Sequence, residues 1–165
     1  MKKLIVYLAI VVGIFGLLSL VNALSKDNST DNPYRKPKSE LHPETVRLLD
    51  DPLYQNNVLP DELNRLIESK ASVFVYFYQS TCPYCKETTP VLMPIAQSLG
   101  IDLKQFNLLE FPEGWQKYGI EATPTVVFYK DGKEVERLKG GYVEQPTPGG
   151  HTKEEFEQFF RRHKA

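Results

Sequence analysis

Two cysteines, Cys82 and Cys85, are the residues of this chain whose type and spacing most clearly indicate chemistry. They are the only cysteines in the 165 residues, and Pro83 and Tyr84 separate them. At this spacing, the thiolate of one cysteine can attack a substrate disulfide, and the second thiol can then resolve the mixed disulfide. The pair therefore predicts reversible dithiol–disulfide exchange.

The neighbouring sequence predicts how the pair is positioned. Residues 73–78 are β-branched and aromatic, as strands are, and the run after Cys85 has the polar composition of an exposed first helical turn. A strand that leads into a helix through the pair places Cys82 at the helix N-terminus, where unpaired backbone N–H groups stabilise a thiolate. We therefore expect Cys82 to be the attacking thiol and Cys85 the resolving thiol.

Other uses of the cysteines fit less well. A zinc site needs about four ligands, and the histidines are scattered without ligand spacing, at His42, His151 and His163. A structural disulfide would close too short a loop to remove much unfolded-chain entropy, and inert buried thiols do not suit a helix start. Copper(I) sites usually add Met or His, and only Met93 lies fairly near. We therefore expect no metal and no organic cofactor.

The N-terminus predicts the compartment. Lys2 and Lys3 precede the stretch Leu4 to Leu24, which carries no charge and is long enough, at about 30 Å, for the hydrocarbon core of a bilayer. The lysines favour a cytoplasmic N-terminus. Residues 1–24 are therefore expected to form a transmembrane signal-anchor helix that leaves the rest of the chain outside the cytoplasm. The alternative is a secretory signal cleaved after Ala23, which would release the domain.

The remainder of the chain divides into a polar linker and one domain. Residues 25–41 are rich in Ser, Asn, Asp, Lys and Pro, a composition that cannot bury enough apolar surface to offset its ordering entropy. Residues 42–165 have the usual length of one domain. The formal net charge of −1 gives no reason to expect nucleic-acid binding.

Periodicity and turn residues predict an alternating α/β order within the domain. Two prolines in the helix that follows the cysteines each remove a backbone donor, so a kink or break is expected there. The expected helices cover 42–49, 61–69, 83–99, 113–118 and a C-terminal segment that Thr152 caps, and the expected strands cover 73–78, 101–106, 125–129 and 134–138.

This order and three motifs resemble the thioredoxin family. Pro90 stands eight residues after Cys82, where thioredoxins have a helix-kinking proline. The segment 117–125 resembles the one that leads into the thioredoxin cis-proline, and 128–133 resembles the hairpin that follows it. The resemblance covers about Asp61 to Lys164 and implies a thioredoxin fold, in which helices flank a mixed central sheet.

The resemblance also assigns a docking loop. It implies a cis peptide bond before Pro124, with Thr123 and Pro124 lying against the active-site sulfur and pairing with an extended substrate segment. We expect Tyr84 to contribute to the apolar rim of this substrate site. The implied activity is thiol–disulfide oxidoreduction on exported, cysteine-containing proteins, with a membrane electron donor or acceptor as a second partner. An accessory or holdase module with little turnover is the alternative.

The chain departs from the family at three places beside the cysteines. Thr81 stands where thioredoxins usually have Trp, and Tyr76 where they have a buried Asp beneath the second cysteine. Because that acid helps to remove the proton of the resolving thiol, its absence puts thioredoxin-like reductase kinetics in doubt. Pro83-Tyr84 replaces the usual Gly-Pro and resembles glutaredoxins, although the rest of the chain does not. The direction of net electron flow is left open.

Overall fold

The structure is a computed structural model that describes residues 2–27 and 30–164. The chain forms two compact units, Met1–Leu41 and His42–Ala165. The first contains helix α1, Lys2–Asp27, and the 3-10 turn η1, Lys38–Glu40. Within the described residues, no helix combines the length and the apolar character needed to cross a membrane. The transmembrane signal-anchor helix that the sequence predicts over residues 1–24 is therefore not found among the described residues.

The second unit is built on a four-stranded sheet with the order β2-β1-β3-β4. Strand β1 pairs in parallel with β2, whereas β1 with β3 and β3 with β4 are antiparallel. The sheet is therefore mixed, as the resemblance implies. The strands are β1 Val73–Tyr78, β2 Leu103–Asn107, β3 Thr125–Lys130 and β4 Lys133–Lys139.

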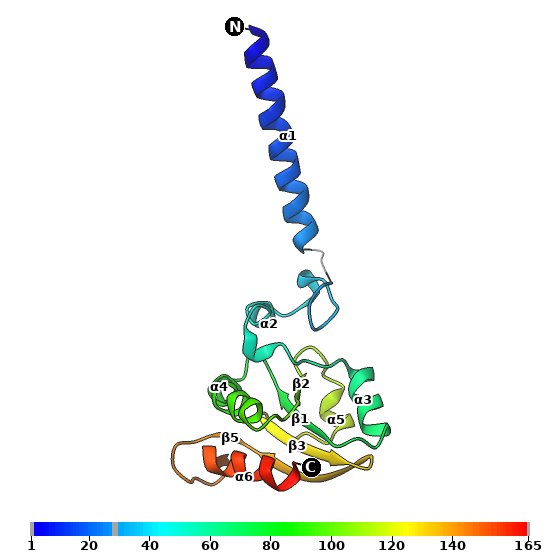
Figure 1. The fold of residues 1–165 in the computed structure, drawn as a ribbon, viewed down its shortest axis with the longest axis vertical. Coiled ribbons are helices and arrows are strands. Elements are labelled where there is room, and N and C mark those ends of the chain that lie inside the picture. The colour runs from blue at the N-terminus through cyan, green and yellow to red at the C-terminus, as the bar shows by residue number, and fades with distance from the viewer. Residues whose placement is uncertain (1, 28–29, 165) are drawn as a thin grey trace. The chain divides into compact units, whose positions relative to one another are not determined.

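Helices cover both faces of this sheet (Figure 1). One face carries α4 and α6, the other α3 and α5. The alternating side chains of β1 explain this arrangement, because Phe74 packs on Phe159 of α6 while Phe77 packs on Tyr118 beside α5. All six β1 side chains are buried, as expected for a strand that is covered on both faces. The domain's helices are α2 Pro43–Val46, α3 Pro60–Glu68, α4 Pro83–Ser98, α5 Gly114–Lys117 and α6 Lys153–His163.

Helix α4 runs through both of its prolines without a break. Pro90 and Pro94 lie inside the helix, so the break that the sequence allows does not occur. Each proline removes one backbone hydrogen bond. The apolar face of α4 compensates, because Leu92, Ile95 and Ala96 are buried in the core shared with β1 and α6. Packing therefore holds the helix together where its own hydrogen bonds are incomplete.

Two short features lie outside the elements expected from sequence. Strands β5, Gly141–Tyr142, and β6, Gly150–His151, form a separate two-stranded parallel sheet between β4 and α6. The 3-10 turn η2, Pro52–Tyr54, precedes a segment whose Asn57 makes an isolated parallel bridge to Gln105 of β2. Neither is long enough to produce a recognisable periodicity, which is why the sequence does not predict them.

Candidate active site

The Cys82 sulfur lies at the open end of helix α4. Cys82 is the N-cap residue of the helix, and its Sγ accepts a hydrogen bond from the backbone N–H of Cys85 at 3.3 Å. It is half-buried, and its thiol donates to the carbonyl oxygen of Thr123 at 3.5 Å. Both cysteines are in the free thiol form. A thiolate at this position would receive the N–H bond and the favourable end of the helix dipole.

Cys85 lies one turn further along and is only 1% exposed. Removal of this thiol from water raises its pKa well above the ordinary value, and hydrogen bonding with Cys82 acts in the same direction. A buried thiol of this kind keeps its proton at neutral pH. The two sulfurs therefore differ, with one half-buried at the helix start and one buried and protonated.

Aromatic and hydroxyl groups lie beneath Cys85. Tyr76 is fully buried, and its hydroxyl donates to the Cys85 carbonyl at 3.3 Å and lies 3.1 Å from the Thr89 hydroxyl. The Thr89 hydroxyl donates to the same carbonyl at 2.8 Å. Burial raises the pKa of Tyr76 well above its usual value, and the nearby Cys85 adds to this shift. A phenol in this state cannot accept the thiol proton at neutral pH.

A buried polar network fixes the loop that leads into Cys82. The hydroxyls of Thr45 and Ser80 lie 2.9 Å apart, and the Asn107 side-chain amide donates to Ser80 at 2.7 Å and to Thr45 at 3.3 Å. All three residues are buried. Sequence reasoning missed them because they come from α2, the active-site loop and the end of β2. The sequence carried no local signal for this network, because β2 has the mixed sequence Leu-Lys-Gln-Phe-Asn.

The Thr123–Pro124 loop lies against the cysteines. The Thr123–Pro124 peptide bond is cis, as the resemblance implies. The Pro124 carbonyl accepts a hydrogen bond from the backbone N–H of Gly140 at 3.0 Å, and the Thr125 hydroxyl donates to the Ala122 carbonyl at 2.8 Å. These bonds hold the loop on both sides. The Thr123 carbonyl therefore faces the Cys82 thiol from the loop that leads into β3.

Tyr84 completes the group of site residues predicted from sequence. Its side chain is 67% exposed, and among the described residues of the domain only Val135 is another strongly exposed large apolar side chain. Tyr84, Thr123 and Pro124 together line one groove of about 530 Å³. The structure thus brings all five predicted site residues to one place. Their individual roles stay predictions.

The described residues were also searched for groups of side chains that could bind a metal ion. In the part of the chain that the structure describes, no group of three or more His, Cys, Asp or Glu side chains is arranged to hold an ion.

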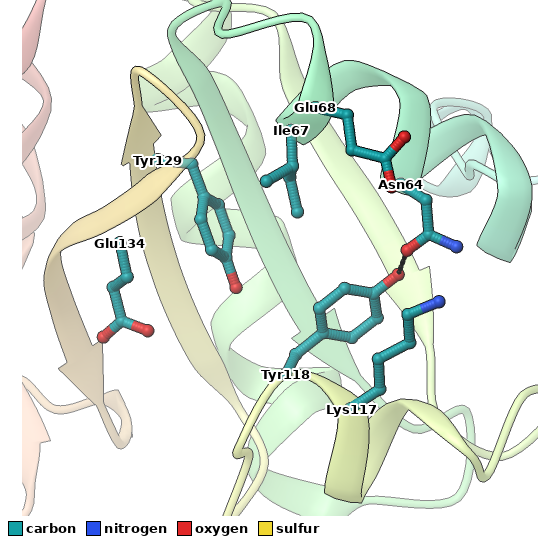
Figure 2. A pocket seen from close by; sticks show the side chains of 7 residues that line it. All are labelled: Asn64, Ile67, Glu68, Lys117, Tyr118, Tyr129 and Glu134. Atoms are coloured by element: carbon teal, nitrogen blue, oxygen red, sulfur yellow. Dashed lines mark hydrogen bonds between the residues drawn. The ribbon is translucent and has the colours of Figure 1, made fainter.

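A second pocket is lined by seven residues whose side chains Figure 2 shows. It has a volume of about 280 Å³ and is lined by α3, α5 and the β3–β4 hairpin. The Tyr118 hydroxyl donates to the Asn64 side-chain oxygen at 2.8 Å, and Arg137 holds the carboxylate of Glu134. Tyr129 of this pocket pairs with Val73, the first residue of β1, whereas Cys82 follows the last. The pocket is therefore remote from the thiols.

Comparison with known proteins agrees with this geometry. The family model described as Thioredoxin matches residues 56–146, which include both cysteines and the Thr123–Pro124 loop. The chain belongs to the thioredoxin family. Its Cys-x-x-Cys pair is the redox-active pair of a thiol–disulfide oxidoreductase.

Individual relatives match less than half of the chain. A thioredoxin-like protein of Fusarium culmorum is 37% identical over 46% of this chain and 65% of its own length. Thioredoxin of Chlamydia caviae is 35% identical over 41% of this chain and 68% of its own length. This chain thus spans about two thirds of the length of these relatives.

Solved structures show the same fold. Thioredoxin of Fasciola hepatica superposes with a TM-score of 0.52 at 25% identity, covering 66% of this chain and 96% of that protein. Thioredoxin of Nicotiana alata gives a TM-score of 0.53 at 23% identity, covering 67% and 94%.

Proposed function

We propose that this protein catalyses thiol–disulfide exchange on exported, cysteine-containing proteins, through a mixed disulfide on Cys82. One observation carries the proposal. The Cys82 sulfur lies at a helix N-terminus and within 3.5 Å of the Thr123 carbonyl, beside an open groove. An extended substrate that lies along Thr123 would present its own sulfur to Cys82.

The reaction follows from the difference between the two thiols. The Cys82 thiolate attacks one sulfur of a substrate disulfide, forms the mixed disulfide and expels the other sulfur as a thiolate. Cys85 then loses its proton and attacks Cys82, which releases the second substrate thiolate and leaves the protein disulfide. Two electrons pass to the substrate, and the reverse sequence oxidises a substrate dithiol.

Proton removal from Cys85 is the difficult step in this chain. Burial raises the pKa of the Cys85 thiol, and the position beneath it holds Tyr76 rather than a carboxylic acid. Once the mixed disulfide has formed, we expect water that enters with the substrate to accept this proton. Resolution should therefore be slower than in a thioredoxin that has the acid.

The test compares two serine variants of the full chain. Cys82→Ser should abolish reduction of an insulin disulfide, whereas Cys85→Ser should accumulate a stable mixed disulfide that mass spectrometry detects. The accessory or holdase function predicts a different result. Cys82→Ser would then suppress the aggregation of chemically reduced insulin as well as the wild type does, and the wild type would show negligible turnover.

The direction of electron flow is set by the reduction potential of the Cys82–Cys85 couple. A value near about −270 mV indicates a reductase supplied by a membrane electron donor, and a value near about −120 mV indicates an oxidase with a membrane acceptor. Equilibration with glutathione buffers, read by alkylation of the free thiols, gives this value.

We also propose that the domain works outside the cytoplasm and that residues 1–24 direct its export. The support is the pair Lys2 and Lys3 before an uncharged stretch, together with the exposure of the apolar side chains of α1 from Ile5 to Val21. Fractionation of cells that express the full chain tests the location. The mass of the exported protein, 18.9 kDa if the chain is intact, distinguishes a retained anchor from a cleaved signal.

A further inference from the structure

A short helix in front of the family-matched residues contacts the start of helix α4. The family match begins at residue 56, whereas α2 covers Pro43–Val46. Glu44 of α2 forms an ion pair with Lys86, in which the carboxylate Oε2 and the ammonium Nζ are 2.8 Å apart. Lys86 directly follows Cys85 in the sequence. A carboxylate from outside the matched region therefore reaches the helix turn that carries the thiols.

Buried hydrogen bonds hold α2 in this position. The side chain of Thr45 is fully buried, and its hydroxyl lies 2.9 Å from that of Ser80, two residues before Cys82. The ring Nδ1 of the N-cap residue His42 accepts a hydrogen bond from the backbone N–H of Glu44 at 3.1 Å. Helix α2 is thus fixed to the loop that precedes Cys82, while Glu44 reaches the helix that follows it.

Lys86 shares one face of α4 with Cys82. The two residues are four apart, and the backbone N–H of Lys86 donates to the Cys82 carbonyl at 3.1 Å. Residues at this spacing are neighbours on a helix surface, and helical side chains lean toward the N-terminus. The Lys86 side chain therefore extends along the turn that begins at Cys82. An unpaired ammonium group there would favour the Cys82 thiolate over the thiol.

Glu44 offsets the charge of Lys86. The hydrogen bond from Lys86 is the main cause that lowers the pKa of Glu44 below its ordinary value, so this carboxylate is ionised at neutral pH. Arg47 contacts the other carboxylate oxygen, but its side chain is 74% exposed and solvent screens most of its charge. The start of α4 thus carries a cation whose field at Cys82 is opposed by an anion from α2.

We propose that Glu44 is a positioning residue for the exchange reaction, which restrains the reactivity of Cys82 by pairing with Lys86. The inference rests on the proposed thiol–disulfide exchange at Cys82. When the thiolate is less stabilised, the reduced protein is less stabilised as well, so it donates electrons more readily. Loss of the Glu44 charge should have the opposite effect and make the protein a stronger oxidant. Helix α2 thereby contributes to the direction of electron flow.

A cycle of charge variants in the full chain tests this role. Glu44→Gln leaves the Lys86 cation unpaired, Lys86→Gln removes that cation and keeps the Glu44 anion, and the double variant removes both charges. The rate at which iodoacetamide labels Cys82 in each reduced protein is measured as a function of pH by peptide mass spectrometry.

The midpoint of this pH–rate profile should move in opposite directions in the two single variants. It should fall by about 0.5 pH unit in Glu44→Gln, because one charge about a helical turn away changes an ionisation constant about threefold. It should rise by a similar amount in Lys86→Gln. The double variant should return close to the wild-type midpoint, because its charges again cancel. A purely structural role of the ion pair would move all three variants in one direction.

Glutathione equilibria and salt provide two further readouts. At a pH above the wild-type midpoint, the disulfide of Glu44→Gln should be reduced by glutathione with an equilibrium constant about threefold larger, which corresponds to about 14 mV. In about 1 M KCl the shifts in midpoint should shrink, because the Debye length falls to about 3 Å. A displaced loop would not respond to salt in this way.

Glu87→Gln is the matched control. It removes the same charge from the residue next to Lys86, but residue 87 lies on a different face of α4 from Cys82, so the midpoint should move less than about half as far. Histidine also changes charge near neutral pH, so the profiles are repeated with His42→Asn, which keeps an N-cap acceptor. The other titratable groups on the elements around the site are the same in every variant: Arg47, Tyr54, Tyr76, Tyr84, Cys85, Glu121 and Lys139.

Two results would overturn the role of Glu44 and leave the proposed function intact. A midpoint in Glu44→Gln equal to that of the wild type would show that the ion pair does not influence the thiol. Equal shifts in Glu44→Gln and Glu87→Gln would show a general effect of net charge. A wild type that fails to reduce insulin, while the midpoints keep the expected order, would instead remove the proposed function and leave the control of Cys82 by Glu44 in place.

Discussion

At the scale of single residues, the site depends on the unequal environments of two thiols that are close in sequence. Cys82 caps the helix and remains half-buried, whereas Cys85 is buried above Tyr76 and Thr89. Burial raises the pKa of the Cys85 thiol. The same helix turn thus supplies one sulfur for attack and one that reacts only after a mixed disulfide has formed.

Alkylation should distinguish the two thiols. In the reduced full chain at about pH 7, iodoacetamide should label Cys82 at least about tenfold faster than Cys85, because the reagent needs an accessible thiolate. Peptide mass spectrometry of samples quenched over time gives both rates. The Cys82→Ser variant is the control, in which Cys85 should remain slow. Equal labelling of both thiols would contradict the assignment of roles.

Replacement of Tyr76 by Phe tests whether the buried hydroxyl takes part in resolution. Tyr76→Phe keeps the ring that stacks on Tyr78 and removes both hydrogen-bond contacts of the hydroxyl, so stability should fall by about 1–2 kcal/mol. The rate of mixed-disulfide decay should stay within about twofold, since a phenol with a raised pKa is no base at neutral pH. Stopped-flow kinetics and urea unfolding measure the two effects. A large loss of the decay rate in a folded variant would show that the hydroxyl assists Cys85.

At the scale of elements, the small β5–β6 sheet supplies Gly141, Tyr142 and Gly150 to the lining of the groove beside the docking loop. It lies between β4 and α6, and its backbone is bonded to the docking loop and to α4. The α6 helix begins just after it with a capping box, in which Thr152 and Glu155 bond each other's backbone N–H groups. The segment is thus held by ordered structure on both sides.

Two glycine substitutions should separate steric contact from backbone strain in this segment. Gly140→Ala places a Cβ 2.0 Å from the Gly149 carbonyl oxygen at φ +128°, whereas Gly149→Ala at φ +82° meets nothing within 4 Å. We expect Gly149→Ala to cost about 1 kcal/mol from strain alone. Gly140→Ala should cost about 1–3 kcal/mol more, because the backbone segments at Gly140 and Gly149 must move apart. Urea unfolding at pH 7 measures the loss of stability in both variants. Equal losses would show that the close approach of Gly140 to Gly149 does not limit the stability of the segment.

At the scale of the whole domain, a buried thiol and two buried tyrosine hydroxyls make the stability of the fold sensitive to high pH. Burial raises the pKa of Cys85 and Tyr129 and raises that of Tyr118 to about 12. A group whose pKa is higher in the folded state binds its proton more tightly there, so its contribution to stability is complete below the unfolded pKa. That contribution is lost as the pH rises through the folded value.

Alkaline unfolding should therefore depend on the redox state. In the reduced protein, stability should begin to fall near about pH 8.5, the ordinary thiol pKa, by up to about 1.4 kcal/mol per pH unit from Cys85. In the oxidised protein the fall should begin near about pH 10, where tyrosine ionises. Urea unfolding of both forms from pH 7 to 10.5 measures this, with reduced Cys85→Ala as the control. An onset at the same pH in both forms would contradict the assignment to Cys85.

The sequence by itself determined the local features of this protein. The β-branched and aromatic run of β1 and the Cys-x-x-Cys pair at the start of α4 are read from neighbouring residues, because each depends on local periodicity or spacing. The cis bond before Pro124 was predicted from the resemblance of segment 117–125 to a known family. The same evidence indicated that Tyr76 replaces an acid, although it did not show what the tyrosine contacts.

Only the tertiary structure decided which distant residues surround the thiols. Thr123 meets Cys82 across 41 positions of sequence, and Asn107 meets Thr45 across 62. The continuous α4 helix depends on packing that offsets its two prolines. Strands β5 and β6 have two residues each, which is too short for any periodic signal. These contacts depend on how the sheet brings strand ends and loops together, which no local pattern of side chains encodes.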